Sequence, residues 1–245
     1  MKQPSADAAC KVSTRPISKL LKSLEGVSVV TTTYNEANYV KPFTERVRAA
    51  LTGIPHEIII VDDSSPDGTY DLAVRYADKA IKKVREGQTK GLLVGIESAK
   101  YPIVVTLDID LENPPELIPT LIQEFLSRDC GVLVACRTLI PRFSERLSSK
   151  LIGRDIGARD VYSNFRIYSK NCVVGAKLRL GETFGAELLL VTKERGCKIC
   201  EYLYDPPPRR KEPRVGGTIR ANLRVLYVLA KLKIAMMRGY GKPKR

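Results

Sequence analysis

The sequence predicts an α/β fold with a mostly parallel central sheet and helices on both of its faces. Short apolar runs recur along the first half of the chain, and the stretches between them have the spacing of amphipathic helices. Strands that are apolar on both sides belong to a parallel sheet that is covered on both faces. The predicted strands are 27–32, 57–61, 103–107 and 131–135, and the predicted helices are 38–51, 70–80, 90–100 and 114–127.

Each element follows from its local composition. Residues 27–32 are mainly valine and threonine, and residues 57–61 are mostly isoleucine, as expected of buried strands. Turn residues then separate 57–61 from the next helix. The helix at 114–127 opens with prolines, whose missing N–H does no harm in a first turn.

The regular alternation ends at Arg137. Residues 138–160 are highly charged and show little β pattern, and the chain then reads as a strand, a helix and a strand at 161–168, 184–195 and 198–203. A Pro/Arg-rich loop follows, and then a final helix over 219–238. We expect a basic N-terminal extension (1–25), one α/β domain (26–218) and a basic amphipathic C-terminal helix with its tail (219–245).

Positive charge is concentrated in the second half of the chain. The formal net charge is +14; residues 1–136 hold 16 basic and 18 acidic side chains, whereas residues 137–245 hold 25 and 9. A one-sided basic surface is typical of proteins that bind a polyanion, which can be nucleic acid, an anionic membrane or a phosphorylated substrate. The alternative is that these residues only solubilise exposed helices.

The six cysteines, at 10, 130, 136, 172, 197 and 200, show no paired framework. Cys130 and Cys136 frame an apolar run, which predicts buried thiols in a reducing compartment. Cys197 and Cys200 form a single C-x-x-C in a predicted strand, which favours packing over zinc or redox chemistry. No apolar run is long enough to span a membrane, and residues 1–9 lack an apolar signal core. We therefore expect a protein of the cytosol or of its membrane surfaces.

Acidic residues follow three of the predicted strands, at 33–36, 62–69 and 108–114. Parallel sheets bind ligands beyond the carboxyl ends of their strands, so these segments are the expected site. Asp108 and Asp110 share one side of an extended turn because alternate side chains share a face. With Glu112 they would suit Mg²⁺ or Mn²⁺, which prefers hard oxygen ligands. An ordinary structural turn is the alternative.

The other two acidic segments have both a structural and a functional interpretation. The residues at 62–69 are typical of a turn followed by a helix N-cap. A turn does not require two consecutive acids at the strand end, and Asp63 is placed to accept hydrogen bonds from a base or ribose. Tyr34 either offers its ring to a base or packs in the fold. Glu36 either caps the helix at 38–51 or contacts a ligand.

Three motifs together resemble family 2 glycosyltransferases with the GT-A fold. They are Ser28–Glu36 (SVVTTTYNE), Val61–Thr69 (VDDSSPDGT) and Asp108–Glu116 (DIDLENPPE). Their pattern is most similar to that of the dolichyl-phosphate mannose synthases, and the resemblance runs from about Val27 to Thr218. It implies nucleotide contacts at Thr32, Tyr34, Glu36, Val61 and Asp63, and a diphosphate and metal site at Asp108, Ile109, Asp110 and Glu112. The family usually has proline in place of Thr32 and commonly glutamine in place of Glu112.

The resemblance also assigns roles in the basic half. Arg137 would bind phosphate, Arg146 would hold the acceptor phosphate, with Ser149 beside it, and Arg214 would belong to a loop that closes over donor and metal. Arginine suits phosphate because its planar fork bonds two oxygens at once. Residues 160–165 match a family segment of the form Asp-x-x-Ser-Gly-Phe, with asparagine in place of the glycine.

The implied reaction is the inverting, metal-dependent transfer of mannose from GDP-mannose to dolichyl (polyprenyl) phosphate, with Asp110, Arg137 and Arg214 as the catalytic residues. Alternatives are a UDP-sugar donor (glucose or N-acetylhexosamine), an acceptor other than a lipid, a nucleic-acid-binding protein and an inactive scaffold. The sequence lacks the interleaved aromatic residues and the known modules of nucleic-acid-binding proteins, and three acidic strand ends would repel phosphates. Both features count against nucleic-acid binding. In the final helix, Arg220, Arg224, Lys231 and Arg238 share one side. This arrangement suits a helix lying on the cytoplasmic face of a membrane, with or without a membrane-protein partner; ordinary packing is the alternative.

Overall fold

The computed structural model describes residues 24–140, 142–207 and 217–242, and its centre is a seven-stranded sheet. The strands run in the order β3-β2-β1-β4-β6-β5-β7, and all are parallel except β6, which is antiparallel to both of its neighbours. The predicted α/β fold with a mostly parallel sheet is confirmed. The strands are β1 (Val27–Thr33), β2 (His56–Asp62), β3 (Lys79–Lys82), β4 (Ile103–Thr106), β5 (Val132–Arg137), β6 (Arg166–Ser169) and β7 (Ile199–Tyr204).

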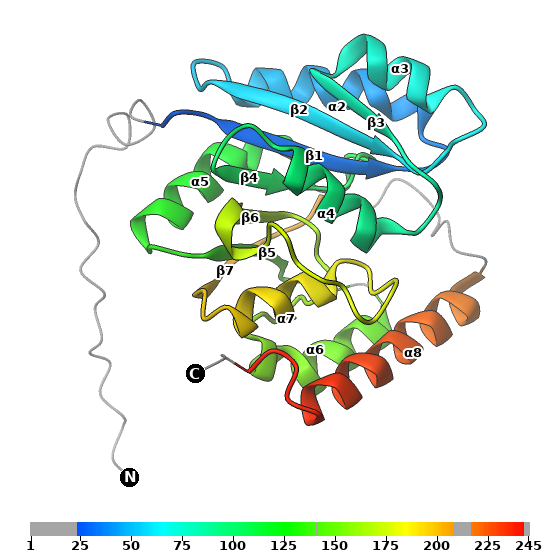
Figure 1. Ribbon diagram of the computed structural model, residues 1–245, viewed down its shortest axis with the longest axis vertical. Helices are drawn as coiled ribbons and strands as arrows, with labels where there is room; N and C mark the ends of the chain where they lie inside the picture. Colours follow the sequence, from blue (N-terminus) through cyan, green and yellow to red (C-terminus); the bar gives the residue numbers. More distant parts are fainter. Residues whose placement is uncertain (1–23, 141, 208–216, 243–245) are drawn as a thin grey trace.

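Helices cover both faces of this sheet (Figure 1). Successive strand residues point to opposite faces, so Ile58 and Ile60 of β2 join one core cluster and Ile59 and Val61 the other. Helices α2, α3 and α5 pack in the first cluster, and α4, α6, α7 and α8 in the second. The helices are α2 (Ala37–Ala50), α3 (Thr69–Tyr76), α4 (Gln88–Ser98), α5 (Ile118–Ser127), α6 (Phe143–Ile156), α7 (Ala186–Glu194) and α8 (Gly217–Met237), with short 3₁₀ turns at Pro115–Leu117 and Lys170–Cys172.

Two glycines let α4 lie close to β1. A Cβ atom at Gly91 would lie 2.8 Å from Cγ2 of Thr32, and one at Gly95 would overlap Val30 Cγ1. Contacts this short do not occur between real side chains. This close packing places the first turn of α4 beside the carboxyl ends of β1 and β2.

The structure corrects three secondary-structure predictions. The helix expected over 70–80 ends at Tyr76, and β3 follows as a short, charged edge strand whose lysines hide its β character. The strand expected over 161–168 is limited to β6, and it runs antiparallel. The charged segment 138–160 contains α6, of 14 residues, which its weak apolar pattern did not predict.

The prediction that the cysteines are unpaired was wrong, because Cys130 is bonded to Cys200 and Cys172 to Cys197. Parallel pairing of β5 and β7 brings Cys130 to Cys200, and the antiparallel pairing of β6 with β5 brings the turn that holds Cys172 to Cys197. The partners lie 70 and 25 positions apart, so their spacing along the chain conceals both pairs. The compartment expected from free thiols therefore loses its support. Cys136 is a buried free thiol, as predicted, and Cys10 lies outside the described residues. None of the described helices combines the length and apolar character needed to cross a bilayer.

Candidate active site

The three acidic segments meet at one edge of the sheet, where β1, β2 and β4 end. Asn35, Ser64 and Leu111, one after each of these strands, have positive φ angles of 59°, 59° and 62°. Non-glycine residues rarely adopt this conformation, and it is found where a fold holds a functional loop in a fixed shape. The chain therefore turns sharply at all three strand ends and leaves their polar side chains at the edge.

Asp108 and Asp110 face the same space, while Ile109 between them is buried in the core. Asp108 Oδ1 accepts hydrogen bonds from Gln88 Nε2 at 2.7 Å and, more weakly, from Asn164 Nδ2 at 3.5 Å. Burial, with the nearby Asp110 charge, raises the pKa of Asp108 to about 7. The alternation expected of the Asp-x-Asp motif is therefore present, and its two carboxyl groups interact unfavourably without a cation.

These side chains fit a Mg²⁺ or Mn²⁺ ion that shares its coordination with a ligand. No three His, Cys, Asp or Glu side chains in the described parts of the chain form a ready-made metal cluster. Such ions commonly bind through one or two carboxylates and complete their shell with water and phosphate oxygens. The crowded Asp108 and Asp110 would provide the carboxylates, and Glu112 lies beside them, with its N–H donating to Asp110 Oδ1 at 3.1 Å.

A cavity of about 330 Å³ opens beside these acids. Its walls differ in chemistry. Asp108, Asp110 and Glu112 form an acidic wall. Basic and ion-paired side chains from the β5–α6 region and α8 form a second, and apolar side chains form a third. The second wall includes Arg137, Arg142, Glu145 and Arg224, and the third includes Leu139, Tyr162, Phe184, Pro206, Pro207, Ala221 and Val225.

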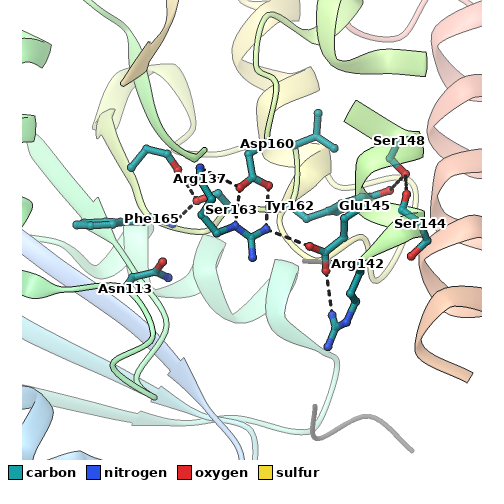
Figure 2. A network of polar contacts seen from close by, with 12 residues as sticks. Asn113, Arg137, Arg142, Ser144, Glu145, Ser148, Asp160, Tyr162, Ser163 and Phe165 are labelled. Carbon is teal, nitrogen blue, oxygen red and sulfur yellow. Dashed lines mark hydrogen bonds and ion pairs between the residues drawn. The ribbon is translucent and has the colours of Figure 1, made fainter. Parts of the chain in front are cut away.

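Arg137 is held by a network of four charged residues (Figure 2), called here the ion-pair network. Its Nε and one terminal nitrogen donate to the two carboxylate oxygens of Asp160 at 2.6 and 3.0 Å. The same terminal nitrogen donates to Glu145 at 3.1 Å, and Arg142 donates to the other Glu145 oxygen at 3.0 Å. Burial alone would lower the pKa of Arg137, but its bonds and charge contacts with Asp160 and Glu145 raise it. Arg137 is therefore a fixed cation in the cavity wall.

The loop that carries Asp160 is fixed from beneath by Arg166, a fully buried residue that the sequence analysis did not single out. Its guanidinium donates to the backbone oxygens of Ser163, Val161 and Gly185 at 2.6, 3.0 and 2.7 Å. These bonds join the loop to the start of α7. Ser163 in turn donates to the Ala135 carbonyl in β5 at 2.7 Å.

A second group of polar residues surrounds Asp63 at the end of β2. Lys83 Nζ contacts Asp63 Oδ1, and the Gly87 N–H donates to Asp63 Oδ2 at 3.0 Å. Arg85 stacks on Tyr34, with its guanidinium carbon 3.7 Å from the ring centroid. Sequence reasoning missed Lys83 and Arg85 because they follow β3, the strand that was not predicted.

The remaining predicted nucleotide residues lie beside this group without lining the cavity. Thr32 packs against α4 at Gly91, and Val61 is buried in the core, so only its backbone can reach a ligand. Glu36 occupies the N-cap position of α2, but its side chain makes no capping hydrogen bond. Asp67 instead accepts from the Ala37 N–H at 3.2 Å.

Of the two other arginines predicted to act in the site, one lies away from the cavity and the other is outside the described residues. Arg146 is exposed on α6 and does not line the cavity, whereas Arg142, one turn earlier, does. Ser149 is partly buried on the same helix and is also absent from the cavity wall. Arg214 lies outside the described residues.

Comparison with known proteins identifies the family. The model of glycosyl transferase family 2 matches residues 28–172, which include all three acidic strand ends and the ion-pair network. The chain belongs to glycosyl transferase family 2. The dolichol-phosphate mannosyltransferase of Pyrococcus furiosus is 30% identical over 84% of this chain and 64% of its own length. The dodecaprenyl-phosphate galacturonate synthase of Rhizobium johnstonii is 33% identical over 66% of this chain and 52% of its own length. The chain thus spans about half to two thirds of these relatives.

A solved structure of similar fold is glucosyl-3-phosphoglycerate synthase from Mycobacterium tuberculosis, in complex with Mn²⁺, UDP and glucosyl-3-phosphoglycerate. It superposes with a TM-score of 0.71 at 19% identity, over 95% of this chain and 86% of that one. At this level of identity the match establishes the fold, and this family 2 chain has the GT-A architecture that its motifs implied.

Proposed function

We propose that this protein transfers a hexose from a nucleotide diphosphate sugar to a polyprenyl phosphate, with GDP-mannose as donor and dolichyl phosphate as acceptor. The observation that carries this proposal is the cavity itself. Carboxylates on one wall suit a metal-bound diphosphate, arginines on another suit a phosphate, and the apolar wall suits a hydrocarbon chain. The two relatives named above also carry a polyprenyl phosphate in their names.

The donor would lie across the ends of β1, β2 and β4. Asp63, held by Lys83, would accept hydrogen bonds from the base or ribose. The Tyr34 ring, already stacked by Arg85, would pack against the base. Asp108, Asp110 and Glu112 would hold Mg²⁺ or Mn²⁺, which neutralises the charge of a diphosphate leaving group when bound. Asp110 is the proposed catalytic carboxylate.

The acceptor phosphate would approach along the cavity wall that carries the arginines. Arg137, Arg142 and Arg224 line that wall and would orient the phosphate, and Arg214 would close over the donor. A phosphate monoester is anionic near neutral pH, so its oxygen can attack the anomeric carbon without a strong base. This agrees with a chain whose single histidine, His56, begins β2 at the opposite edge of the sheet. Alignment and charge neutralisation would then supply most of the rate enhancement.

The acceptor implies a place of action at a membrane surface. A polyprenyl chain stays in a bilayer, so the enzyme would work peripherally on the cytoplasmic face. A membrane-protein subunit is a further partner to test, because the proposed acceptor lies in a bilayer. Nucleic acid is not an expected partner, since three acidic strand ends would repel it.

The test is a donor screen in detergent-dispersed lipid. Radiolabelled GDP-mannose, UDP-glucose and UDP-N-acetylhexosamine are each incubated with dolichyl phosphate and Mn²⁺ or Mg²⁺. We expect a lipid-linked product from GDP-mannose that disappears with EDTA and in Asp110→Asn. Glu116→Gln changes an exposed side chain that pairs with Arg46 and does not line the cavity, so this matched control should keep full activity. Product from a UDP-sugar alone would replace the donor assignment, and no product from any donor would refute the proposal.

A further inference from the structure

Exposed apolar side chains gather on one side of the protein. Among the described residues, eleven large apolar side chains are exposed, and eight of them belong to two segments, 139–151 and 219–237. These segments include most of α6 and of α8, which pack side by side (Figure 1). The eight residues, called here the docking face, are Leu139, Phe143, Leu151, Ile219, Leu223, Tyr227, Ile234 and Met237.

The pattern on α8 shows that this exposure is not a by-product of core packing. The inner side of α8 is already buried through Val225, Val228 and Leu232. Leu223 and Tyr227 lie one turn apart on another side, with 61% and 66% of their surface exposed. Clustered apolar surface of this kind marks a site that another surface covers.

Basic residues flank the docking face. Residues 217–237 contain no Asp or Glu, and the exposed charges of α6 are mostly positive. Two copies of this chain meeting through the face would bring like charges together, whereas an anionic lipid surface would neutralise them. The exposed basic residues are Arg146, Lys150 and Arg154 on α6, Arg220, Arg224 and Lys233 on α8, and Arg238 and Lys242 just beyond it.

The cavity is bordered by the same two helical segments. Leu139 and Arg142 line it from the start of the α6 segment, and Ala221, Arg224 and Val225 line it from α8. A surface that covered the docking face would therefore lie beside the cavity wall that carries Arg142 and Arg224.

We propose that the docking face binds directly to an anionic phospholipid bilayer and presents the cavity to lipids in that bilayer. Apolar side chains would enter the interfacial layer while the flanking Lys and Arg side chains contact the headgroups, as in interfacial helices. The docking itself rests only on the exposed face. Its use for delivering the acceptor rests on the proposed function.

Sedimentation with vesicles tests the docking. The full chain is mixed with protein-free vesicles of phosphatidylcholine, with or without phosphatidylglycerol. We expect the protein to bind only the anionic vesicles, and Leu223→Glu/Tyr227→Glu to lower that binding more than tenfold. Val74→Glu is the matched control, because Val74 is an exposed valine (58%) on α3, away from the docking face, and this variant should bind like the unmodified protein. Circular dichroism and thermal unfolding show that each variant is folded.

Three outcomes would overturn the proposal. The first is equal vesicle binding by the double variant and the unmodified protein. The second is a stable dimer in size-exclusion chromatography that the double variant abolishes, because the face would then be an interface between copies. The third is binding only to vesicles that contain membrane proteins, which would favour a protein partner.

A soluble acceptor separates this inference from the proposed function. Leu223 and Tyr227 do not line the cavity, so the double variant should turn over a short-chain, water-soluble polyprenyl phosphate as fast as the unmodified protein. It should lose activity only on long-chain acceptor held in vesicles. If the unmodified protein transfers sugar to neither acceptor but vesicle binding still depends on the face, the proposed function fails and the docking stands.

Discussion

Replacing Asp160 with asparagine tests whether the ion-pair network fixes Arg137. The side chain of Asp160 is 1% exposed and that of Arg137 16%, and two side-chain hydrogen bonds of 2.6 and 3.0 Å join them. Breaking one partner of a buried pair costs about 3–5 kcal/mol, because the other charge stays buried. Asparagine keeps one acceptor oxygen and Glu145 still contacts Arg137, so we expect a loss of about 3 kcal/mol in unfolding free energy.

The matched control has the same geometry at the surface. Arg46 donates to both oxygens of Glu116 at 2.8 and 2.7 Å, but these side chains are 40% and 55% exposed. Solvent screens such a pair, so Glu116→Gln should cost less than about 1 kcal/mol. In a chain of this size, 1 kcal/mol shifts the midpoint of thermal unfolding by roughly 2–4 °C. Asp160→Asn should therefore lower the midpoint by about 6–12 °C and Glu116→Gln by less than about 4 °C.

Calorimetry and steady-state kinetics on the two variants measure these effects. Besides the loss of stability, Asp160→Asn should raise KM for the lipid acceptor, because Arg137 is no longer held in the cavity wall, and leave KM for the nucleotide sugar unchanged. Equal, small stability losses in both variants would refute the reasoning, since burial would then make no difference. A stability loss with unchanged acceptor KM would show that the network supports the fold alone.

Three further predictions concern other parts of the fold. Lys83→Met should raise KM for the nucleotide sugar about 10-fold, because Asp63 loses its charged partner; steady-state kinetics with varied nucleotide sugar check this. Cys200→Ser removes the disulfide to Cys130, which lies 70 positions away in the sequence, and should lower the unfolding free energy by about 4 kcal/mol in denaturant titration. Gly95→Ala should destabilise the protein by about 1–3 kcal/mol, because the added methyl would overlap a β1 valine; unchanged stability would mean that α4 can shift.

The acidic side of the site could be predicted from the sequence because it depends on strand ends. Parallel strands align their carboxyl ends, so locating β1, β2 and β4 was enough to bring Asp63, Asp108 and Asp110 to one edge. Lys83 and Arg85 could not be found in this way. They depend on β3, whose two lysines give a four-residue edge strand no apolar signal.

The basic side was predicted less well because it depends on which side of a helix is buried. Ser144, Glu145 and Ser148 form part of the buried side of α6, although their types suggest a solvent-facing surface. Without that packing, the sequence could not show that Arg142 faces the cavity and Arg146 faces outward. The disulfides escaped prediction for a similar reason, since the pairing of β5 with both β6 and β7 decides which cysteines meet.

The structure also separates two uses of positive charge that the sequence presents as one. Arg137 and Arg142 in the cavity wall are matched by Asp160 and Glu145, so the ion-pair network carries no net charge. Most of the excess of residues 137–245 must therefore lie elsewhere, and much of it is exposed on α6 and α8. Dissolved salt weakens the attraction between an exposed charge and a charged surface, whereas it weakens the attraction within a buried ion pair much less. Added salt should therefore weaken vesicle binding and turnover of vesicle-held acceptor, while turnover of a short, soluble acceptor changes far less.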